Sequence, residues 1–251
     1  MKNKVVKVNA AIAIIGNEIL SGRTQDVNLS TISKWLNTLG VRVVEVRVIP
    51  DIEKRIIETI NELRKKFDYV FTTGGIGPTH DDITSESVSK AFRLKYEIHK
   101  EAFKILQDYY KISNFNEGRQ RMTKMPSKAK LILNPSSGAP GFIIENVFCL
   151  QGVPSILKSM LGGLRNNIKG GKPILTHTIN LQTVESQISK QLAEVQGKHR
   201  DVEIGSYPFF KTGKVGVSVV LRSEKQSKID DCNLQIIRFI SKANIKQIDK
   251  S

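Results

Sequence analysis

The chain is poor in the residues and segments that mark several large classes of protein. It has only two cysteines, Cys149 and Cys232, which lie far apart and have no partners at metal-ligand spacing. This favours reduced thiols in a core over a disulfide framework or a cysteine-metal site. No stretch approaches the roughly 20 apolar residues that cross a membrane, and the N-terminal residues do not read as a signal peptide. We therefore expect a soluble, cytoplasmic protein with no membrane partner.

Acidic residues are also scarce relative to basic ones. The 251 residues include 39 lysines and arginines against 24 aspartates and glutamates, a formal net charge of +15. Such an excess favours polyanionic partners, but lysines spread over helix faces have the same charge and only keep a protein in solution. We do not expect nucleic acid to be the physiological partner on this basis. The length is sufficient for a main domain and a smaller one.

The first two thirds of the chain alternate between strand-like and helix-like patterns. Residues 5–15 form a β-branched and alanine-rich run, and residues 27–39 have helical spacing that stops at Gly40. This alternation predicts an α/β fold, with a mostly parallel sheet between two layers of helices. The other expected elements are strands at 41–49, 67–71, 130–133 and 141–150, helices at 52–67 and 154–168, and two or three helices within 85–125.

A short polar and flexible segment, residues 169–173, divides the chain into predicted domains at 1–170 and 171–251. The second part has a different order of elements. Strands at 174–181, 202–210 and 215–222 and helices at 185–195 and 228–240 predict a small β-α-β-β-α domain of the α+β class. Gly213 and Gly216 match the G-x-x-G loop of KH modules, but they join two strands, so we interpret them as a hairpin turn.

The most informative segment is the turn at residues 72–84, which follows an apolar strand and precedes a helix. Its glycines, Gly74, Gly75 and Gly77, allow backbone N–H groups to approach a ligand, and the helix start adds unpaired donors. The adjacent Asp81 and Asp82 indicate a divalent cation held against phosphate oxygens. The alternative is an ordinary tight turn between a strand and a helix.

Five ordered motifs carry a family resemblance, which extends over nearly the whole chain. They are residues 16–28, 50–51, 73–84, 134–142 and 150–154. Together they resemble the N-terminal domain of CinA (competence/damage-inducible) proteins, which is similar to the molybdopterin-binding MoaB/Mog proteins. Residues 201–208 resemble the small, KH-like domain that follows in CinA-like proteins and a part of eukaryotic FAD synthases. The resemblance implies a MoaB/Mog-like fold without the deamidase domain of full-length CinA.

The resemblance implies two chemistries for the same kind of ligand. The main hypothesis is a metal-dependent pyrophosphatase that uses Mg²⁺, Mn²⁺ or Co²⁺ to hydrolyse ADP-ribose or a related dinucleotide. The alternatives are molybdopterin binding or adenylylation in molybdenum cofactor biosynthesis, and a non-enzymatic role related to competence or damage. In each case the expected ligand is a small nucleotide or pterin, and a homo-oligomer, dimer or trimer, is implied.

Site residues follow from their positions in these motifs. Asp51 and Asp82 are the catalytic candidates, and they and Asp81 are the metal ligands. Each has a structural alternative: Asp82 as a helix cap, Asp51 as a helix entry, Asp81 as a solvated acid. The expected substrate-binding residues are Glu18, Asn28, Thr73, Gly74, Gly75, Gly77, Thr84, Ser137, Gly138, Gly152 and Pro154. Glu18, expected near the end of the first strand with Asn28, has a structural salt bridge as its alternative.

The chain departs from the family pattern in the last motif. Gln151 stands where the family has a proline, and Ile156-Leu157 stand where it has Glu-Met. The loss of an acid removes one contact to metal or substrate, and the loss of the proline loosens the turn. We expect weaker activity or an altered substrate as a result.

Overall fold

The computed structural model describes residues 7–211 and 214–248. The chain divides into two compact units, Met1–Gly171 and Lys172–Ser251. Among the described residues, no helix is both long and apolar enough to cross a membrane. Residues 5 and 6 of the first predicted strand lie outside the described part, as does Gly213 of the predicted hairpin turn.

The first unit is built on a six-stranded sheet with the order β2-β1-β3-β8-β7-β6. Four strands are parallel: β2 (Val41–Ile49), β1 (Val8–Ile15), β3 (Tyr69–Thr73) and β8 (Val147–Leu150). The other two, β7 (Gly141–Ile144) and β6 (Lys130–Ile132), each run antiparallel to the preceding neighbour in the sheet. Because β1 and β3 are covered on both faces, their side chains are apolar almost throughout. The predicted mostly parallel sheet is confirmed.

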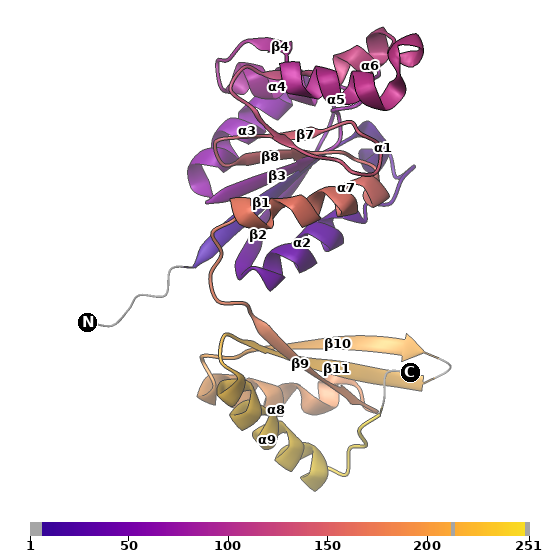
Figure 1. Ribbon diagram of the computed structural model, residues 1–251. Helices are drawn as coiled ribbons and strands as arrows, with labels where there is room; N and C mark the ends of the chain where they lie inside the picture. The colour runs from indigo at the N-terminus through magenta and orange to yellow at the C-terminus, as the bar shows by residue number, and fades with distance from the viewer. Residues whose placement is uncertain (1–6, 212–213, 249–251) are drawn as a thin grey trace, which may run out of the picture. The chain divides into compact units, whose positions relative to one another are not determined.

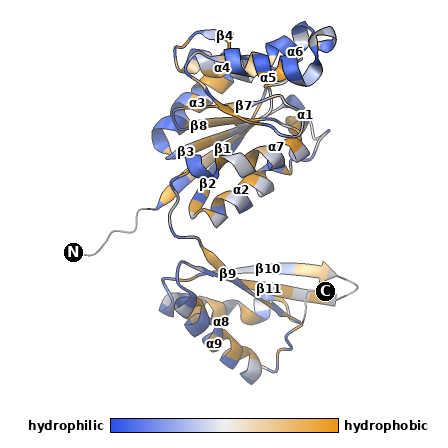
Figure 2. Cartoon of the chain, viewed as in Figure 1, coloured by the Kyte–Doolittle hydropathy of each residue, from blue (hydrophilic) through white to orange (hydrophobic). Residues whose placement is uncertain are grey.

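Helices cover both faces of this sheet, which makes the unit three layers thick (Figure 1). Helices α2 (Asn28–Thr38) and α7 (Pro154–Leu161) pack on one face. Helices α3 (Glu53–Lys66) and α4 (Thr84–Ala91) pack on the other. Hydrophobic colours follow the central strands, and hydrophilic colours gather on the helices (Figure 2). The three-layer α/β/α fold is therefore confirmed.

Both thiols and several aromatic side chains are buried in the cores of the two units. The rings of Phe71 and Phe148 stack with their centroids 4.8 Å apart, and Trp35 meets Phe71 edge-on. Cys149 and Cys232 are both buried and unbridged, in agreement with the predicted reduced thiols. Burial raises the pKa of the Cys149 thiol to about 12, so this thiol is protonated and unreactive at neutral pH.

Three predictions of local structure were wrong in detail. Residues 85–125 contain, besides α5 (Lys100–Tyr110) and α6 (Glu117–Arg121), a two-stranded sheet of β4 (Tyr96–Ile98) and β5 (Lys124–Pro126). Residues 141–150 are a tight hairpin, in which Glu145 adopts a φ of 51°. The helix expected at 154–168 ends at Leu161 and continues as the 3-10 helix η2 (Gly162–Asn167) because two glycines follow. A 3-10 turn, η1 (Ile112–Asn114), follows α5.

The second unit has the predicted β-α-β-β-α order of elements. It consists of β9 (Leu175–Leu181), α8 (Glu185–Lys198), β10 (Glu203–Lys211), β11 (Lys214–Ser223) and α9 (Gln226–Lys242). The strands form an antiparallel sheet with the order β10-β11-β9. Apolar side chains of both helices, among them Ile188 and Ile236, pack with Leu221 of the sheet to form a separate core. A smaller α+β unit with antiparallel strands is thus confirmed.

Candidate functional site

Four of the predicted motifs lie at one edge of the six-stranded sheet. Gly16 follows β1, Asp51 follows β2, Gly74 follows β3 and Gly152 follows β8. These four strands are parallel neighbours, so their carboxyl ends meet at the same edge. Such an edge is where open α/β sheets bind their ligands. The candidate site is built from the loops that leave these strands.

The glycine-rich turn after β3 requires glycine because its backbone is packed against neighbouring chain. Gly74 has a φ of +94°, and a Cβ atom added there would lie 2.1 Å from the carbonyl oxygen of Ile15. Gly75 has a φ of +67°, and its added Cβ would lie 2.2 Å from Oγ1 of Thr84. The amide of Thr84 also donates to the carbonyl of Gly75 at 2.8 Å. These contacts join the end of β3 to β1 and to the start of α4.

Asn28 connects two of the loops across 124 residues of sequence. Its Nδ2 donates to the carbonyl of Gly152 at 2.7 Å. A Cβ atom added to Gly152 would lie 3.3 Å from Cα of Gly74. The start of α2, the loop after β8 and the glycine turn therefore form one structure. Glu18 and Asn28 lie on the helices that follow β1: the chain turns at Gly16 into α1 (Asn17–Leu20), and α2 begins at Asn28.

Three buried polar atoms around these loops have no hydrogen-bond partner within the described part of the chain: Oδ1 of Asn28, Oγ1 of Thr84 and Nε2 of Gln151. Their residues are 5%, 0% and 8% exposed. A buried polar atom without a partner costs about 1–3 kcal/mol, so such atoms are rare without a functional reason. They offer one acceptor (Asn28), one donor (Gln151) and the Thr84 hydroxyl, which can act either way. Gln151, noted only as a departure from the family pattern, is a candidate ligand contact.

The carboxylates at this edge interact electrostatically. Oδ2 of Asp51 accepts a hydrogen bond from the amide of Asn17 at 2.8 Å. Burial raises the pKa of Asp51 above its usual value, and the negative charges of Glu18 and Asp81 raise it further, although the Asn17 bond opposes them. Glu18 and Asp81 are therefore close enough to Asp51 for their charges to act on it. A bound cation or a proton would relieve that repulsion.

Asp82 has a structural function in this conformation. Its Oδ2 accepts hydrogen bonds from the amide of Thr79 at 2.8 Å and from Oγ1 of Thr79 at 2.5 Å. A Cβ atom added to Gly77 would lie 2.7 Å from the same oxygen. Neighbouring Asp81 is exposed, and a hydrogen bond from the Thr79 side chain lowers its pKa, with help from the charges of His80 and Arg121. Asp82 thus closes the turn, and Asp81 is ionised and faces solvent.

The carboxylates at this edge fit a metal ion only if oxygen atoms of a bound ligand also coordinate the ion. No group of three His, Cys, Asp or Glu side chains within residues 7–211 and 214–248 is placed to hold an ion. Mg²⁺, however, is commonly held by one or two carboxylates together with substrate phosphates. Asp51 and Asp81, whose charge raises the pKa of Asp51, fit that arrangement. Asp82 could join them if its bonds to Thr79 were released.

The loop after β6 is organised by a residue that the sequence analysis did not single out. Nδ2 of Asn134 donates to Oγ of Ser137 at 2.7 Å and to the carbonyl of Ala139 at 2.9 Å. Gly138 has a φ of +74°, and its added Cβ would lie 2.8 Å from the ring of Tyr109. The Asn134-Pro135 pair, typical of turn starts, is the signal that could have identified this residue. Ser137 and Gly138 are thus held by Asn134 and α5.

We expect Asn28→Ala to lower the free energy of unfolding by about 1–2 kcal/mol, because it leaves the Gly152 carbonyl without its donor. Chemical denaturation of the purified protein measures this change. Asn37→Ala, an exposed position on the same helix, is the matched control and should stay within about 0.5 kcal/mol. Equal effects for the two variants would show that the bond to Gly152 does not hold the loop.

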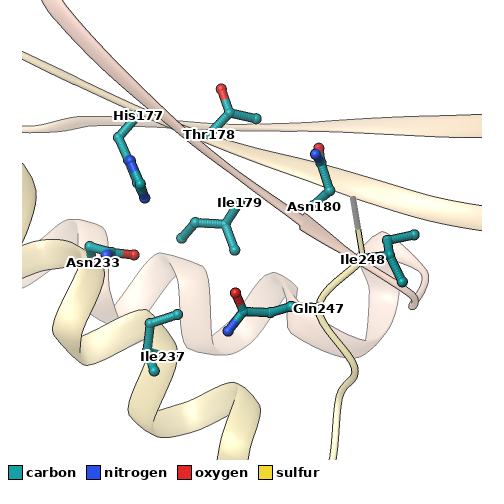
Figure 3. A pocket seen from close by; sticks show the side chains of 8 residues that line it. All are labelled: His177, Thr178, Ile179, Asn180, Asn233, Ile237, Gln247 and Ile248. Atoms are coloured by element: carbon teal, nitrogen blue, oxygen red, sulfur yellow. The ribbon is translucent and has the colours of Figure 1, made fainter. Parts of the chain in front are cut away.

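The second unit has a pocket of its own, with a volume of about 390 Å³, between β9, α9 and the residues after α9 (Figure 3). The amide side chains of Asn233 and Gln247 point into it below Ile179, and His177 lies at its rim. Its lining includes no aspartate, glutamate, lysine or arginine. It therefore lacks the charged groups that hold a diphosphate, and the edge of the six-stranded sheet remains the candidate site.

Comparison with known proteins identifies the family. Residues 11–169 match the family described as "Probable molybdopterin binding domain", and residues 173–249 match "FAD synthase, middle domain". The chain belongs to the molybdopterin-binding domain family. The ligand class expected for such a domain is a small pterin or nucleotide. The resemblance to molybdopterin-binding proteins is thereby confirmed, and the KH-like character of the second unit and the absence of a deamidase domain stay predictions.

Individual relatives support the same assignment. A protein from Archaeoglobus fulgidus is 33% identical over 217 residues, which cover 86% of this chain and 92% of that protein. A protein from Pyrobaculum calidifontis is 32% identical over 210 residues, or 79% of this chain and 80% of that one. The crystal structure of CinA, of unknown function, from Thermoplasma acidophilum aligns with a TM-score of 0.61 and 29% identity, over 64% of this chain and 99% of that one. This molybdopterin-binding domain therefore has a CinA structure among its neighbours.

Proposed function

We propose that the first unit binds a phosphorylated pterin, molybdopterin or a close relative, at the carboxyl edge of its sheet, and that the protein acts in molybdenum cofactor biosynthesis. The observation that carries this proposal is the group of unpartnered polar atoms on Asn28, Thr84 and Gln151 around the glycine loops. A pterin ring presents both donors and acceptors, which such atoms complement. The family match of residues 11–169 points to the same ligand.

Each part of the edge would have its own role in binding. The glycine turn and the start of α4 direct backbone N–H groups and the positive end of a helix dipole at the phosphate. The neutral side chains of Asn28 and Gln151 would hold the ring in one orientation. Asp51 and Asp81 would hold a divalent cation, Mg²⁺, Mn²⁺ or Co²⁺, which neutralises charge on phosphate oxygens when bound. In adenylylation, this arrangement would position an oxygen of the pterin phosphate for attack on the α-phosphorus of a nucleoside triphosphate, from which pyrophosphate leaves.

A second candidate is the metal-dependent hydrolysis of ADP-ribose or a related dinucleotide. It is favoured by the negative charges of Glu18 and Asp81 that act on Asp51, which a cation would neutralise, and by the match of residues 173–249 to the middle domain of FAD synthase. Here Asp82 would have to leave Thr79 in order to act on water or metal. We rank it second because Asp82 is engaged in the turn and the family match names a pterin.

Calorimetry separates the two candidates. The protein is titrated with molybdopterin, ADP-ribose and FAD, each with and without Mg²⁺ or Mn²⁺, and dinucleotide breakdown is followed by chromatography. Binding of molybdopterin without breakdown of either dinucleotide supports the first proposal. Turnover of ADP-ribose or FAD that is lost in Asp82→Ala supports the second. If none of the three ligands binds, both proposals are wrong.

Thr84→Val tests the role of the unpartnered hydroxyl. The variant keeps the shape of the side chain and removes a buried polar atom, so we expect unchanged or higher stability. Affinity for molybdopterin should fall about tenfold, the value of one hydrogen bond of about 1.4 kcal/mol. The control is Thr176→Val, an exposed position on β9 of the second unit. Unchanged affinity in Thr84→Val would remove this hydroxyl from the site.

A further inference from the structure

Strand β2 ends the six-stranded sheet with an open edge. Among the described residues it pairs only with β1 (Figure 1). Three valines near its middle, Val44, Val46 and Val48, are 56%, 39% and 41% exposed. A long edge strand that exposes apolar side chains is a template for pairing with another strand, and proteins usually block such edges with charge, proline or a covering element. β2 also carries charged side chains, among them Glu45 and Arg47, so a strand that pairs with this edge has to match their charges as well as the valines.

The two faces of this edge have different chemistry. Val46 and Val48 pair with Ile12 and Ile14, whose side chains lie on the α2 side, so these two valines share a face with Val41; Val44 is the bulge residue that the register with β1 skips. Glu45 and Arg47 lie on the α3 side: Arg47 donates to Glu62 at 2.7 Å, and Lys66 donates to Glu45 at 2.6 Å. Along the edge, one face is a row of valines and the other alternates between a negative and a positive charge.

The backbone groups that face outward are those of the valines. The carbonyl of Ile49 accepts a hydrogen bond from Gly16, so the polar groups of Ile49 point toward β1. In a strand the direction alternates with a period of two. Glu45 and Arg47 therefore direct their backbone groups toward β1 as well, and Val46 and Val48 direct theirs to the open edge. An added strand would form hydrogen bonds with the valine positions.

The sequence of β2 is complementary to itself in one antiparallel register. Three two-fold registers have their axis near the middle of the strand, at Glu45, Val46 or Arg47. An axis at Glu45 or Arg47 places two like charges opposite each other, which is destabilising. An axis at Val46 pairs Glu45 with the partner's Arg47 and Arg47 with the partner's Glu45, and it places Val46 beside the partner's Val46. Of these three registers, only this one joins opposite charges.

We propose that a second copy of this chain pairs its β2 antiparallel to this strand, across a two-fold axis at Val46. The six-stranded sheets of two copies then become one continuous sheet, with a row of valines on one face and two Glu–Arg pairs on the other. Such an interface is isologous and closes on itself, so the assembly is a dimer and not a trimer. The two carboxyl edges point in opposite directions, which leaves each candidate site open.

Charge exchange tests the register with the full-length protein. Light scattering coupled to size-exclusion chromatography should give about twice the chain mass of 28.1 kDa. In Glu45→Arg, the new arginine at position 45 faces the partner's Arg47. In Arg47→Glu, the new glutamate at position 47 faces the partner's Glu45. Each variant alone should therefore be monomeric, with dimer affinity reduced at least tenfold. An equal mixture of the two variants should restore the dimer, because each then faces its opposite charge.

Controls separate pairing from folding. Glu194→Arg, which changes an exposed charge on α8 of the second unit, should leave the dimer intact. Val46→Lys adds a charge to a valine of the edge that is 39% exposed, and it should also give a monomer. Circular dichroism verifies that each variant is folded. A monomeric or trimeric wild-type protein, dimeric single variants, or a mixture that stays monomeric would each overturn the proposal.

Discussion

Gly74→Ala is expected to lower the free energy of unfolding by about 3 kcal/mol or more. The φ of +94° at Gly74 is strained for any residue with a side chain, and the added Cβ would lie 2.1 Å from the carbonyl oxygen of Ile15. That oxygen belongs to a buried central strand, so it cannot retreat without disturbing the sheet. Urea denaturation monitored by tryptophan fluorescence measures the loss, because the one tryptophan, Trp35, packs against Phe71 in the same unit.

Gly163→Ala is the matched control for this prediction. A Cβ atom added at Gly163 meets nothing within 4 Å, so the variant should lie within about 0.5 kcal/mol of the wild type. If Gly74→Ala is no less stable than Gly163→Ala, the tight approach of the glycine turn to β1 is not present in solution. Because the turn forms the candidate site, ligand binding should be lost together with stability in Gly74→Ala alone.

Asp51→Asn should reduce metal-dependent ligand binding or turnover by about a hundredfold, while making the protein more stable at neutral pH. An asparagine can still accept the hydrogen bond from Asn17 through its Oδ1, but it carries no charge for a cation. It also ends the repulsion with Glu18 and Asp81 that raises the pKa of Asp51. We expect a gain in stability of about 0.5 kcal/mol, discounted because the group is partly in contact with solvent.

The pH dependence of that gain follows from the direction of the pKa shift. Since the pKa of Asp51 is raised above its usual value of 3.8, the folded state binds a proton more tightly than the unfolded state. Ionised Asp51 therefore destabilises the fold at neutral pH, and this cost disappears as the pH falls through the raised pKa toward 3.8. Thermal unfolding between pH 4 and pH 8 should show the difference between variant and wild type shrinking toward acid.

Asp68→Asn is the control for Asp51→Asn. Asp68 also accepts a backbone hydrogen bond, from the amide of Asn9 at 2.8 Å, but it precedes β3 at the opposite edge of the sheet. Its substitution should leave ligand and metal binding unchanged. If Asp51→Asn binds ligand as well as Asp68→Asn does, Asp51 has no part in the site. A variant that loses binding without any gain in stability would instead contradict the electrostatic account.

The fold of the first unit could be predicted from the sequence wherever an element was long enough to show its period. Strand β2 and helix α3 fill nearly their predicted ranges because they extend over nine and fourteen residues. Strands β4 and β5 were missed because three residues show no period, and their pairing joins segments about thirty residues apart. Such short strands depend on tertiary contacts rather than on local preference.

The candidate site was predictable in its loops and less so in its contacts. The glycine turn has the expected place because its turn chemistry is local, and Asp51 follows β2 because the strand itself was evident. The bond from Asn28 to Gly152 spans 124 residues and has no local signature. Asp82 was predicted to be a catalytic residue and a metal ligand. In the structure it accepts two hydrogen bonds from Thr79, and the sequence does not indicate these bonds.

The spacing of the loop residues along the chain has a consequence for folding. The loops that contain Gly16, Asp51, Gly74 and Gly152 each follow a different strand. A nascent chain that lacks β8 therefore has three of the four loops of the candidate site, and Asn28 has no Gly152 carbonyl to bind. Capture of a cofactor precursor would then begin only after the last parallel strand has joined the sheet. A ligand that binds this completed state alone would protect it against proteolysis by mass action, so newly made protein would last longest in cells that contain the pterin.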